Sequence, residues 1–271
     1  MLDNVTIGQF FPGKSLFHRM DPRVKLLLTF GYIVAVFIPQ NWWGLGVAIG
    51  LLVLSIALSK LPPKLFLKGL KPILLVVAIT SLLNIFYVQK GTLLVDWGFL
   101  RIHSGGLVTA AFIALRIICL VMGSSLLTYT TTPTDLTDAL ERLLKPLGWV
   151  RVPVHELAMM MTIALRFIPT LVEETDKIMS AQKARGADME SGGLLKRIKA
   201  LLPVLVPLFV SSFRRAYELA TAMECRCYHG GKGRTRMKQL HVAPRDMWSM
   251  TAFVLFVAGI ILLNIFLPEV L

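Results

Sequence analysis

The chain has 271 residues and a formal net charge of +13, and 55% of its residues are hydrophobic, which gives a mean hydropathy of +0.67. Soluble domains are about 45–50% apolar. The excess here is concentrated in long runs that are almost free of charge, so the composition excludes a soluble globular protein. The positive charge would suggest nucleic acid as a partner of a soluble protein, but cytoplasmic loops of membrane proteins also carry surplus Lys and Arg. We therefore expect an all-α integral membrane protein that contacts the lipid bilayer and no nucleic acid.

Five apolar runs predict membrane-spanning helices. Four lie in an N-terminal membrane domain of residues 1–128, and the fifth forms a C-terminal transmembrane helix within residues 247–271. Asp21 and Pro22 are typical of a helix start, because Asp caps the N-terminus and Pro fits the first turn. Residues 89–105 are expected to form a polar loop. The predicted spans cover residues 24–39, 44–59, 72–88, 106–128 and 247–267.

The basic residues predict the orientation of the chain in the cytoplasmic membrane. Segments 1–25, 60–71 and 129–246 hold 26 of the 29 Lys and Arg residues. Cytoplasmic loops are the positively charged ones, so we expect the N-terminus inside and the C-terminus outside. Six or seven spans are the alternative, because residues 201–213 are also apolar. That run contains two prolines and is too short to cross a bilayer.

Residues 129–246 predict a cytoplasmic domain of long coupling helices. This segment holds 18 of the 29 Lys and Arg and 12 of the 16 Asp and Glu residues. Thr-Pro-Thr-Asp at 132–135 is typical of a helix start, and this helix should end near Lys145. Longer helices are expected at 154–186 and 194–228. We expect one proline to interrupt the first of these and two prolines to interrupt the second.

Both long helices are predicted to end on an arginine, and the two ends match at a fixed sequence offset. Basic residues there suit the negative end of the helix dipole, and a following glycine suits the positive φ of a helix terminus. At the same offset Glu173 and Glu174 correspond to Arg214 and Arg215, so we hypothesise that these charges pair the two helical arms. The matching ends are Ala184, Arg185, Gly186 and Cys225, Arg226, Cys227.

An arginine at an exposed helix end can act beyond its own helix. Its guanidinium offers five donors in a fixed fork and pairs well with carboxylates or carbonyls of another protein. A helix of about 20 residues spans about 30 Å and can transmit movement along its length. The alternative is a solvated cationic helix end, which is common.

These features resemble a known family, the transmembrane T components of energy-coupling factor (ECF) transporters. The two arginine ends look like the family's paired X-Arg-X motifs. Their contexts are similar too, namely Leu-Arg-Phe-Ile-Pro-Thr at 165–170 and Arg-Arg-Ala-Tyr-Glu-Leu-Ala at 214–220. His-Arg-Met-Asp-Pro-Arg at 18–23 resembles the family's N-terminal signature. The resemblance covers essentially the whole chain.

The resemblance implies a scaffold and energy-coupling subunit. A T component holds one membrane-embedded substrate-binding S component and two ATPase subunits, and ATP and Mg bind to the ATPases. By position, Arg185 and Arg226 with their flanking residues would be the ATPase-docking residues. The chain itself would bind no cofactor and would not be an enzyme, and its cargo would be a vitamin or another micronutrient. The second motif departs from the family pattern, because cysteines flank the arginine and the nearest glycines are Gly230 and Gly231.

Arg116 lies near the middle of the fourth predicted span, where a charge needs a polar partner. We weigh a contact near the S component against an internal pairing with carbonyls or with Asn84, and favour the internal pairing. Cys225, Cys227 and His229 are close in sequence, but three ligands fall short of the usual four of a structural zinc site. We therefore expect no metal.

Two other classes of function stay open. A permease of another ABC importer would line its own substrate path with polar or broken helices around the middle of the membrane, and few residues fit that pattern. A membrane enzyme would need converging acidic, histidine or metal-binding groups, and no such group stands out. No Gly-rich phosphate loop precedes a Lys-Ser/Thr pair either.

Overall fold

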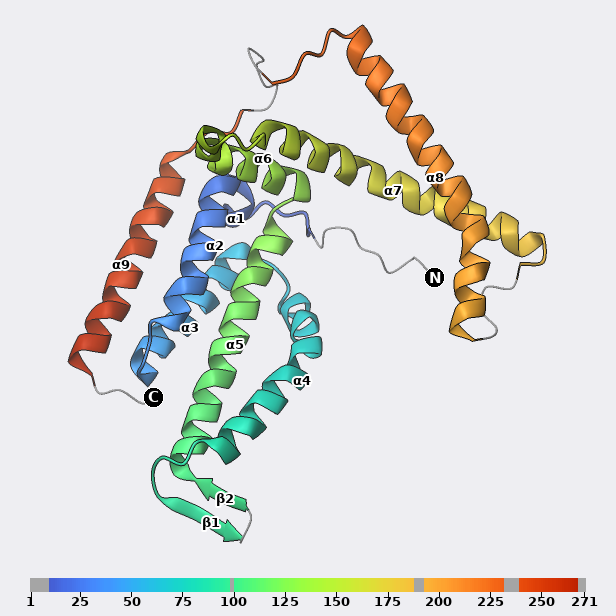
Figure 1. Cartoon of the computed structure of the whole chain (residues 1–271). Coiled ribbons are helices and arrows are strands. Elements are labelled where there is room, and N and C mark those ends of the chain that lie inside the picture. Colours follow the sequence, from blue (N-terminus) through green and yellow to red (C-terminus); the bar gives the residue numbers. More distant parts are fainter. Residues whose placement is uncertain (1–9, 98–99, 188–192, 232–238, 268–271) are drawn as a thin grey trace. The chain divides into compact units, whose positions relative to one another are not determined.

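The computed structural model describes residues 10–97, 100–187, 193–231 and 239–267, which are mostly helical (Figure 1). Contacts divide the chain into two compact units. We call the described residues of 8–139 and 239–271 the bundle unit, and those of 140–238 the arm unit. The elements in chain order are α1 (Leu16–Arg19), α2 (Pro22–Phe37), α3 (Trp42–Ser59), α4 (Pro63–Tyr87), β1 (Leu93–Trp97), β2 (Leu100–His103), α5 (Ser104–Thr130), α6 (Pro133–Leu144), the 3-10 helix η1 (Lys145–Val150), α7 (Val154–Ala184), α8 (Leu194–Cys225) and α9 (Pro244–Phe266).

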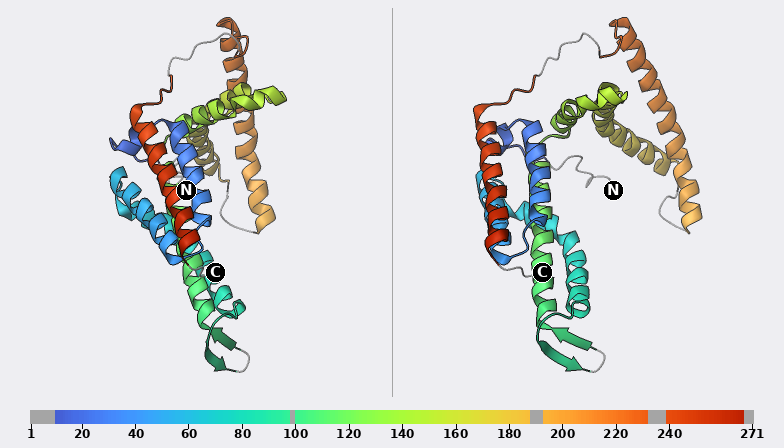
Figure 2. Two further views of the ribbon diagram at one scale, coloured as in Figure 1. Left: turned by 90° about the vertical axis from the view of Figure 1, so that its left-hand side faces the viewer. Right: turned by 60° about the vertical axis from the view of Figure 1, so that its left-hand side comes forward.

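Helix α5 lies at the centre of the bundle unit. It contacts α2, α3 and α4, and α9 packs on α2 and α3 (Figure 2). A Cβ atom at Gly123 of α5 would lie 2.4 Å from Cε1 of Tyr32, so glycine is what lets α2 approach α5 here. The buried core residues around this contact are Tyr32, Val36, Ala48, Leu52, Cys119 and Ile260.

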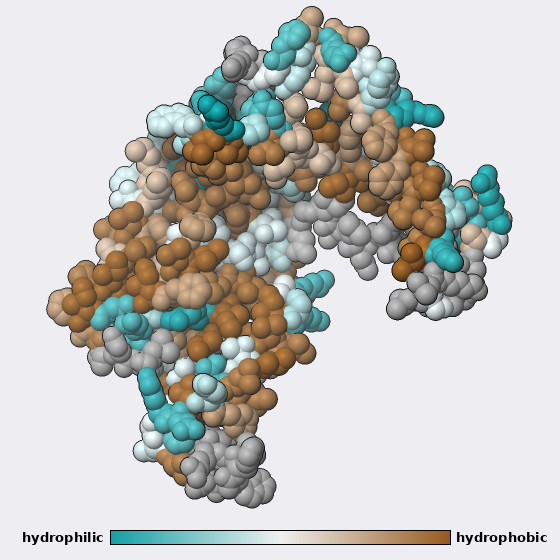
Figure 3. Space-filling view, viewed as in Figure 1, coloured by the Kyte–Doolittle hydropathy of each residue, from teal (hydrophilic) through white to brown (hydrophobic). Residues whose placement is uncertain are grey.

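The bundle unit also exposes much apolar surface. Leu75 and Leu83 on α4 are 67% and 63% exposed, and hydrophobic residues cover most of the face shown in Figure 3. Such a surface is unfavourable in water and matches lipid chains instead. The chain is therefore a multi-pass membrane protein.

Five helices of the described chain are long and apolar enough to cross a membrane, namely α3, α4, α5, α7 and α9. Four of these helices correspond to predicted spans, whereas α7 lies in the segment predicted to be cytoplasmic. The predicted span 24–39 corresponds to α2, which has 16 residues and is about 24 Å long, shorter than a hydrocarbon core of about 30 Å. Helix α7 counts instead because of its apolar N-terminal half, whereas Glu173, Glu174, Asp176 and Lys177 make its C-terminal half polar.

The two predicted helix starts are confirmed. The carboxylate of Asp21 accepts a hydrogen bond from the backbone N–H of Arg23 at 2.9 Å, with Pro22 at the first position of α2. The hydroxyl of Thr132 accepts from the backbone N–H of Asp135 at 3.1 Å at the start of α6. Each cap satisfies a backbone donor that the first helical turn leaves without a partner.

The expected polar loop at 89–105 is wrong at residues 93–97 and 100–103. Strands β1 and β2 pair antiparallel there, with Asp96 opposite Arg101 and Trp97 opposite Leu100. Leu, Val, Trp and Ile predominate in these strands and favour extended backbone. The pairing also satisfies backbone groups that a loop would leave to water.

The predicted interruptions of the two long helices are wrong. Helix α7 has 31 residues and passes through Pro169, and α8 has 32 residues and passes through Pro203 and Pro207. A proline removes one backbone donor and crowds the preceding turn, yet the flanking turns continue as helix in both cases. Helix α8 ends at Cys225, three residues before the predicted end. The assignment of residues 129–246 to the cytoplasm stays a prediction.

Candidate functional site

Helix α7 ends in a Schellman motif around Arg185. Arg185 is the C-cap residue, and Gly186 follows it with φ +85°. The N–H of Gly186 donates to the carbonyl of Lys183 and the N–H of Ala187 donates to the carbonyl of Gln182, both at 3.0 Å. These two bonds satisfy carbonyls that the last helical turn would otherwise leave free.

Helix α8 ends in the same motif around Arg226. The N–H of Cys227 donates to the carbonyl of Glu224 at 2.9 Å, and the N–H of Tyr228 donates to the carbonyl of Met223 at 3.0 Å. Cys227 takes the left-handed conformation, with φ +55°, that Gly186 takes at the end of α7. The departure from the family pattern therefore changes the residue but not the geometry. Gly230 and Gly231 are not the cap residues.

Both arginines are exposed to solvent. The residues on either side of them are exposed too, namely Ala184, Gly186, Cys225 and Cys227. Within the residues that the structure describes, neither the Arg185 nor the Arg226 guanidinium has an ion-pair partner. Each helix therefore presents one cationic fork at its end, with its backbone carbonyls already capped. We call these two ends the arm tips.

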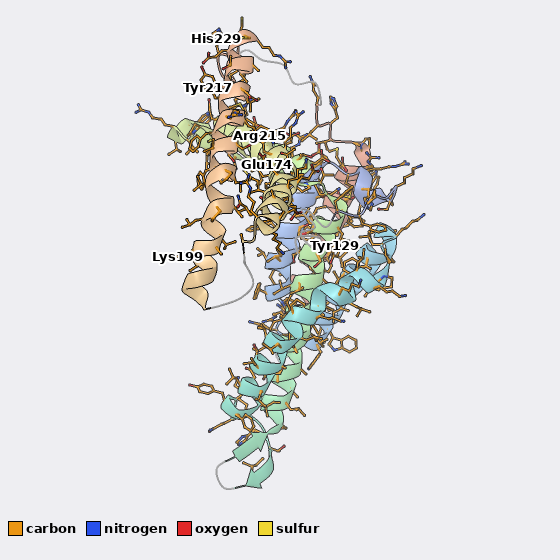
Figure 4. The ribbon with its side chains drawn as sticks, turned by 90° about the vertical axis from the view of Figure 1, so that its right-hand side faces the viewer. Tyr129, Glu174, Lys199, Arg215, Tyr217 and His229 are labelled. Atoms are coloured by element: carbon orange, nitrogen blue, oxygen red, sulfur yellow. The ribbon has the colours of Figure 1, made fainter. Side chains whose placement is uncertain are left out.

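The two arm helices meet at an ion pair. The guanidinium of Arg215 on α8 donates to the carboxylate of Glu174 on α7 at 2.7 Å, and the hydroxyl of Ser211 donates to the same carboxylate. Figure 4 labels Glu174 and Arg215 at this crossing. Glu173 and Arg214 are exposed instead. The structure thus brings together one of the two charge pairs that the sequence offered.

The arm tips lie at equal distances from this crossing. Arg185 follows Glu174 by eleven residues, and Arg226 follows Arg215 by eleven residues. At the helical rise this separation is about 16 Å along each helix. The sequence offset between the two motifs therefore corresponds to equal lengths of helix between the crossing and each arm tip.

A second contact closes the arm unit and was not predicted. The chain that leaves α8 returns to the start of α7, where the hydroxyl of Tyr228 lies 2.9 Å from the sulfur of Met159. A Cβ atom at Gly231 would lie 2.2 Å from Cδ2 of His155, and Nδ1 of His155 lies 2.9 Å from the carboxylate of Glu141 on α6. These residues are far apart in the sequence and share no motif, so no sequence pattern pointed to them.

Arg116 of α5 has an internal partner in the bundle unit. Its guanidinium donates to the carbonyl of Pro39 at 2.6 Å and lies 4.9 Å from the ring centroid of Phe112. The amide of Asn84 donates to the carbonyl of Thr80 within its own helix. A backbone carbonyl of the α2–α3 connection and an aromatic face therefore accommodate this intramembrane charge.

Over the described ranges, no three His, Cys, Asp or Glu side chains lie close enough together to hold a metal ion. Cys225, Cys227 and His229 follow one another across the end of α8, and all three are exposed. The absence of a bound metal, nucleotide or other cofactor on this chain stays a prediction.

Comparison with known proteins adds to these features. The CbiQ family, described as cobalt transport protein, matches residues 13–237. The chain is 54% identical over 263 residues to the "Energy-coupling factor transporter transmembrane protein EcfT" of Clostridium kluyveri, covering 96% of this chain and 97% of the relative. It is 51% identical to the protein of that name from Ruminiclostridium cellulolyticum, covering 97% and 98%, and 47% identical to that from Bacillus subtilis, covering 95% and 97%. The predicted family is thereby confirmed, and the chain belongs to the family of transmembrane energy-coupling components of ECF transporters.

Proposed function

We propose that this chain is the scaffold that links two ATPase subunits to a membrane-embedded, substrate-binding S component of an importer. The observation that supports this most directly is the pair of arm tips. Two helix ends share one cap geometry, and each presents one exposed arginine. A bidentate cation at a fixed position suits recognition of carboxylates or carbonyls on another protein. Each arm tip then docks on one ATPase.

The arm helices supply the mechanical link. Helices of 31 and 32 residues are about 46–48 Å long and resist compression along their axes. Because they are joined at Glu174 and Arg215, a displacement of one arm tip acts on the other arm through the crossing. ATP binding and hydrolysis take place on the partner subunits, so the chain transmits motion and performs no catalysis itself.

A stripe of exposed apolar residues on α8 supports a membrane-embedded partner. Its members recur at helical spacing along one side of the helix, and Figure 3 shows hydrophobic residues gathered along the arm helices. A charged or soluble partner would leave this stripe in water, whereas an S component offers apolar surface. The stripe consists of Leu202, Val206, Phe209, Phe213 and Tyr217.

This proposal keeps the short helix α2 as the first span and places residues 129–246, α7 included, in the cytoplasm, so the N-terminus lies inside and the C-terminus outside. The vitamin or other micronutrient would bind to the S component, so this chain would need no substrate site. A permease that lines its own path is the second candidate. The intramembrane Arg116 would be its clearest polar group, but one N–H group of that guanidinium already donates to the carbonyl of Pro39.

The test is co-purification of the tagged native chain from membranes, compared with Arg185→Glu, Arg226→Glu and the double variant. Losing one buried charged anchor costs about 2–5 kcal/mol at a protein interface, so each single change should reduce ATPase recovery and the double change should abolish it. Arg214→Glu is the matched control, since it reverses an exposed charge on α8 away from the arm tip. Recovery of no ATPase with the native chain would contradict the scaffold. Binding that ignores both tip arginines would contradict the docking role.

A further inference from the structure

The N-terminal motif at residues 18–23 has no part in the arm tips, yet it lies beside a segment of the bundle unit that connects α9 to the arm unit. The chain leaves α5 through Thr130 and Thr131 into α6, and it passes into the arm unit within α6, between Ala139 and Leu140. It returns through residues 239–243 into α9. Movement of the arm unit that reaches α5 or α9 along the chain passes through these two connections.

Lys25 holds the departing connection. Its ammonium group donates to the carbonyl of Thr130 at 2.9 Å and contacts the hydroxyl of Thr131 at 3.3 Å. Lys25 is only 5% exposed, and a buried ammonium is unfavourable unless such acceptors surround it. The next residue, Thr132, caps α6. The junction between α5 and α6 is therefore fixed from the side by α2.

Arg23 holds the returning connection. Its guanidinium donates to the carbonyl of Leu240 at 3.1 Å and is itself fixed by the carboxylate of Asp21 at 2.8 Å. Asp246, which is fully buried, accepts hydrogen bonds from the N–H of Ala243 at 2.8 Å and from the N–H of Asp21 at 3.4 Å. The segment before α9 is thus tied to the start of α2.

We infer that Asp21, Arg23 and Lys25 form a clamp that transmits movement between the arm unit and the bundle unit. This inference rests on the proposed function. Thr131 is extended, and so is Ala243, and extended connections without lateral contacts would absorb a displacement by rotating their backbone dihedrals. The clamp fixes both connections to one helix. A displacement of the arm unit then moves α5 and α9 instead of bending their connections.

The three residues are positioning residues, because they act through the connections that they hold. One variant of Lys25 and one variant of Arg23 each remove the contact between that residue and its connection. Lys25→Met keeps the length of the side chain and removes the ammonium, whereas Lys25→Arg restores a donor. Arg23→Gln removes the contact with the carbonyl of Leu240, since the shorter glutamine side chain cannot reach that carbonyl. Lys64→Met is the matched control, because Lys64 is an exposed lysine of α4 in the same unit.

The experiment is hydrogen–deuterium exchange on the complex purified in nanodiscs with its ATPases, with and without a non-hydrolysable ATP analogue. In the native complex the analogue should change exchange rates in the arm unit and also in the last turn of α5 and the first turn of α9. With Lys25→Met or Arg23→Gln, we expect the analogue still to change exchange rates in the arm unit. Its effect on exchange rates in α5 and α9 should fall by about tenfold, because one hydrogen bond to a charged group contributes about that factor. Lys25→Arg should restore it in part, and Lys64→Met should leave it unchanged.

Two outcomes would overturn the clamp alone. One is a bundle response of native size in both variants. The other is faster exchange throughout the bundle before nucleotide is added, which would make these residues stabilising groups only. Absence of the ATPases from the native preparation would overturn the proposed function and the clamp with it, so the two failures are distinguishable.

Discussion

The arm tips allow a prediction about backbone geometry, because the same left-handed position holds glycine in one tip and cysteine in the other. Gly186 has φ +85° and Cys227 has φ +55°. A residue with a Cβ atom in this conformation costs about 1–2 kcal/mol, and glycine avoids that cost. Gly186→Ala should therefore destabilise the end of α7 by about 1 kcal/mol, whereas Cys227→Gly should stabilise the end of α8 by up to about 1 kcal/mol.

The assay is amide exchange of the residues whose N–H groups close each Schellman motif. Opening of the α7 tip in Gly186→Ala should become about fivefold more frequent, since about 1 kcal/mol corresponds to that factor. Cys227→Gly should slow exchange at Tyr228 and leave ATPase recovery undiminished, because the cap and not the thiol positions Arg226. Unchanged exchange in Gly186→Ala, or loss of ATPase binding in Cys227→Gly, would refute this reasoning.

Three further changes test other contacts. Glu174→Arg should weaken the arm crossing by about 0.5–1 kcal/mol, since the pair is partly solvated, and the double variant with Arg215→Glu should restore ATPase recovery; no restoration would argue against the crossing. Arg116→Met should lower the melting temperature of the detergent-solubilised chain, by a stability loss of about 1.5–3 kcal/mol, without changing ATPase recovery, and an unchanged melting temperature would contradict the internal role. Gly231→Ala places a methyl group 2.2 Å from the ring of His155, so it should speed exchange at the start of α7 by displacing the chain after α8. Exchange at native rates there would show that this contact is not formed.

The sequence predicted those elements whose signals are local. Asp21 before Pro22 and Thr132 before Pro133 mark helix starts because capping depends on residues within one turn, and both starts were found. The apolar runs of α3, α4, α5 and α9 were equally visible, since a span depends on composition over consecutive residues. The identity of the fifth apolar helix was harder, because α2 is short and α7 changes from apolar to charged along its length.

Tertiary contacts were less accessible to sequence reasoning. The offset between the two arginine motifs suggested that acidic and basic residues of the arms face one another, but it could not select Glu174 and Arg215 over Glu173 and Arg214. That choice depends on the rotation of each helix about its axis, which no spacing reports. Lys25 was likewise one basic residue among many until its acceptors on Thr130 and Thr131 were seen.

The end of α8 shows which constraint determines the arm tips. Glycines stand at positions 230 and 231, so three more residues of helix would have reached a residue without the left-handed cost. The helix ends at Cys225 instead and places Cys227 in the unfavourable conformation. A longer helix would carry Arg226 inside its last turns and away from the cap position. Ending at Cys225 puts Arg226 in the C-cap position that Arg185 has on the other arm, eleven residues beyond the crossing in both cases, so the end of this helix follows the position of the arginine and not that of the nearest glycine.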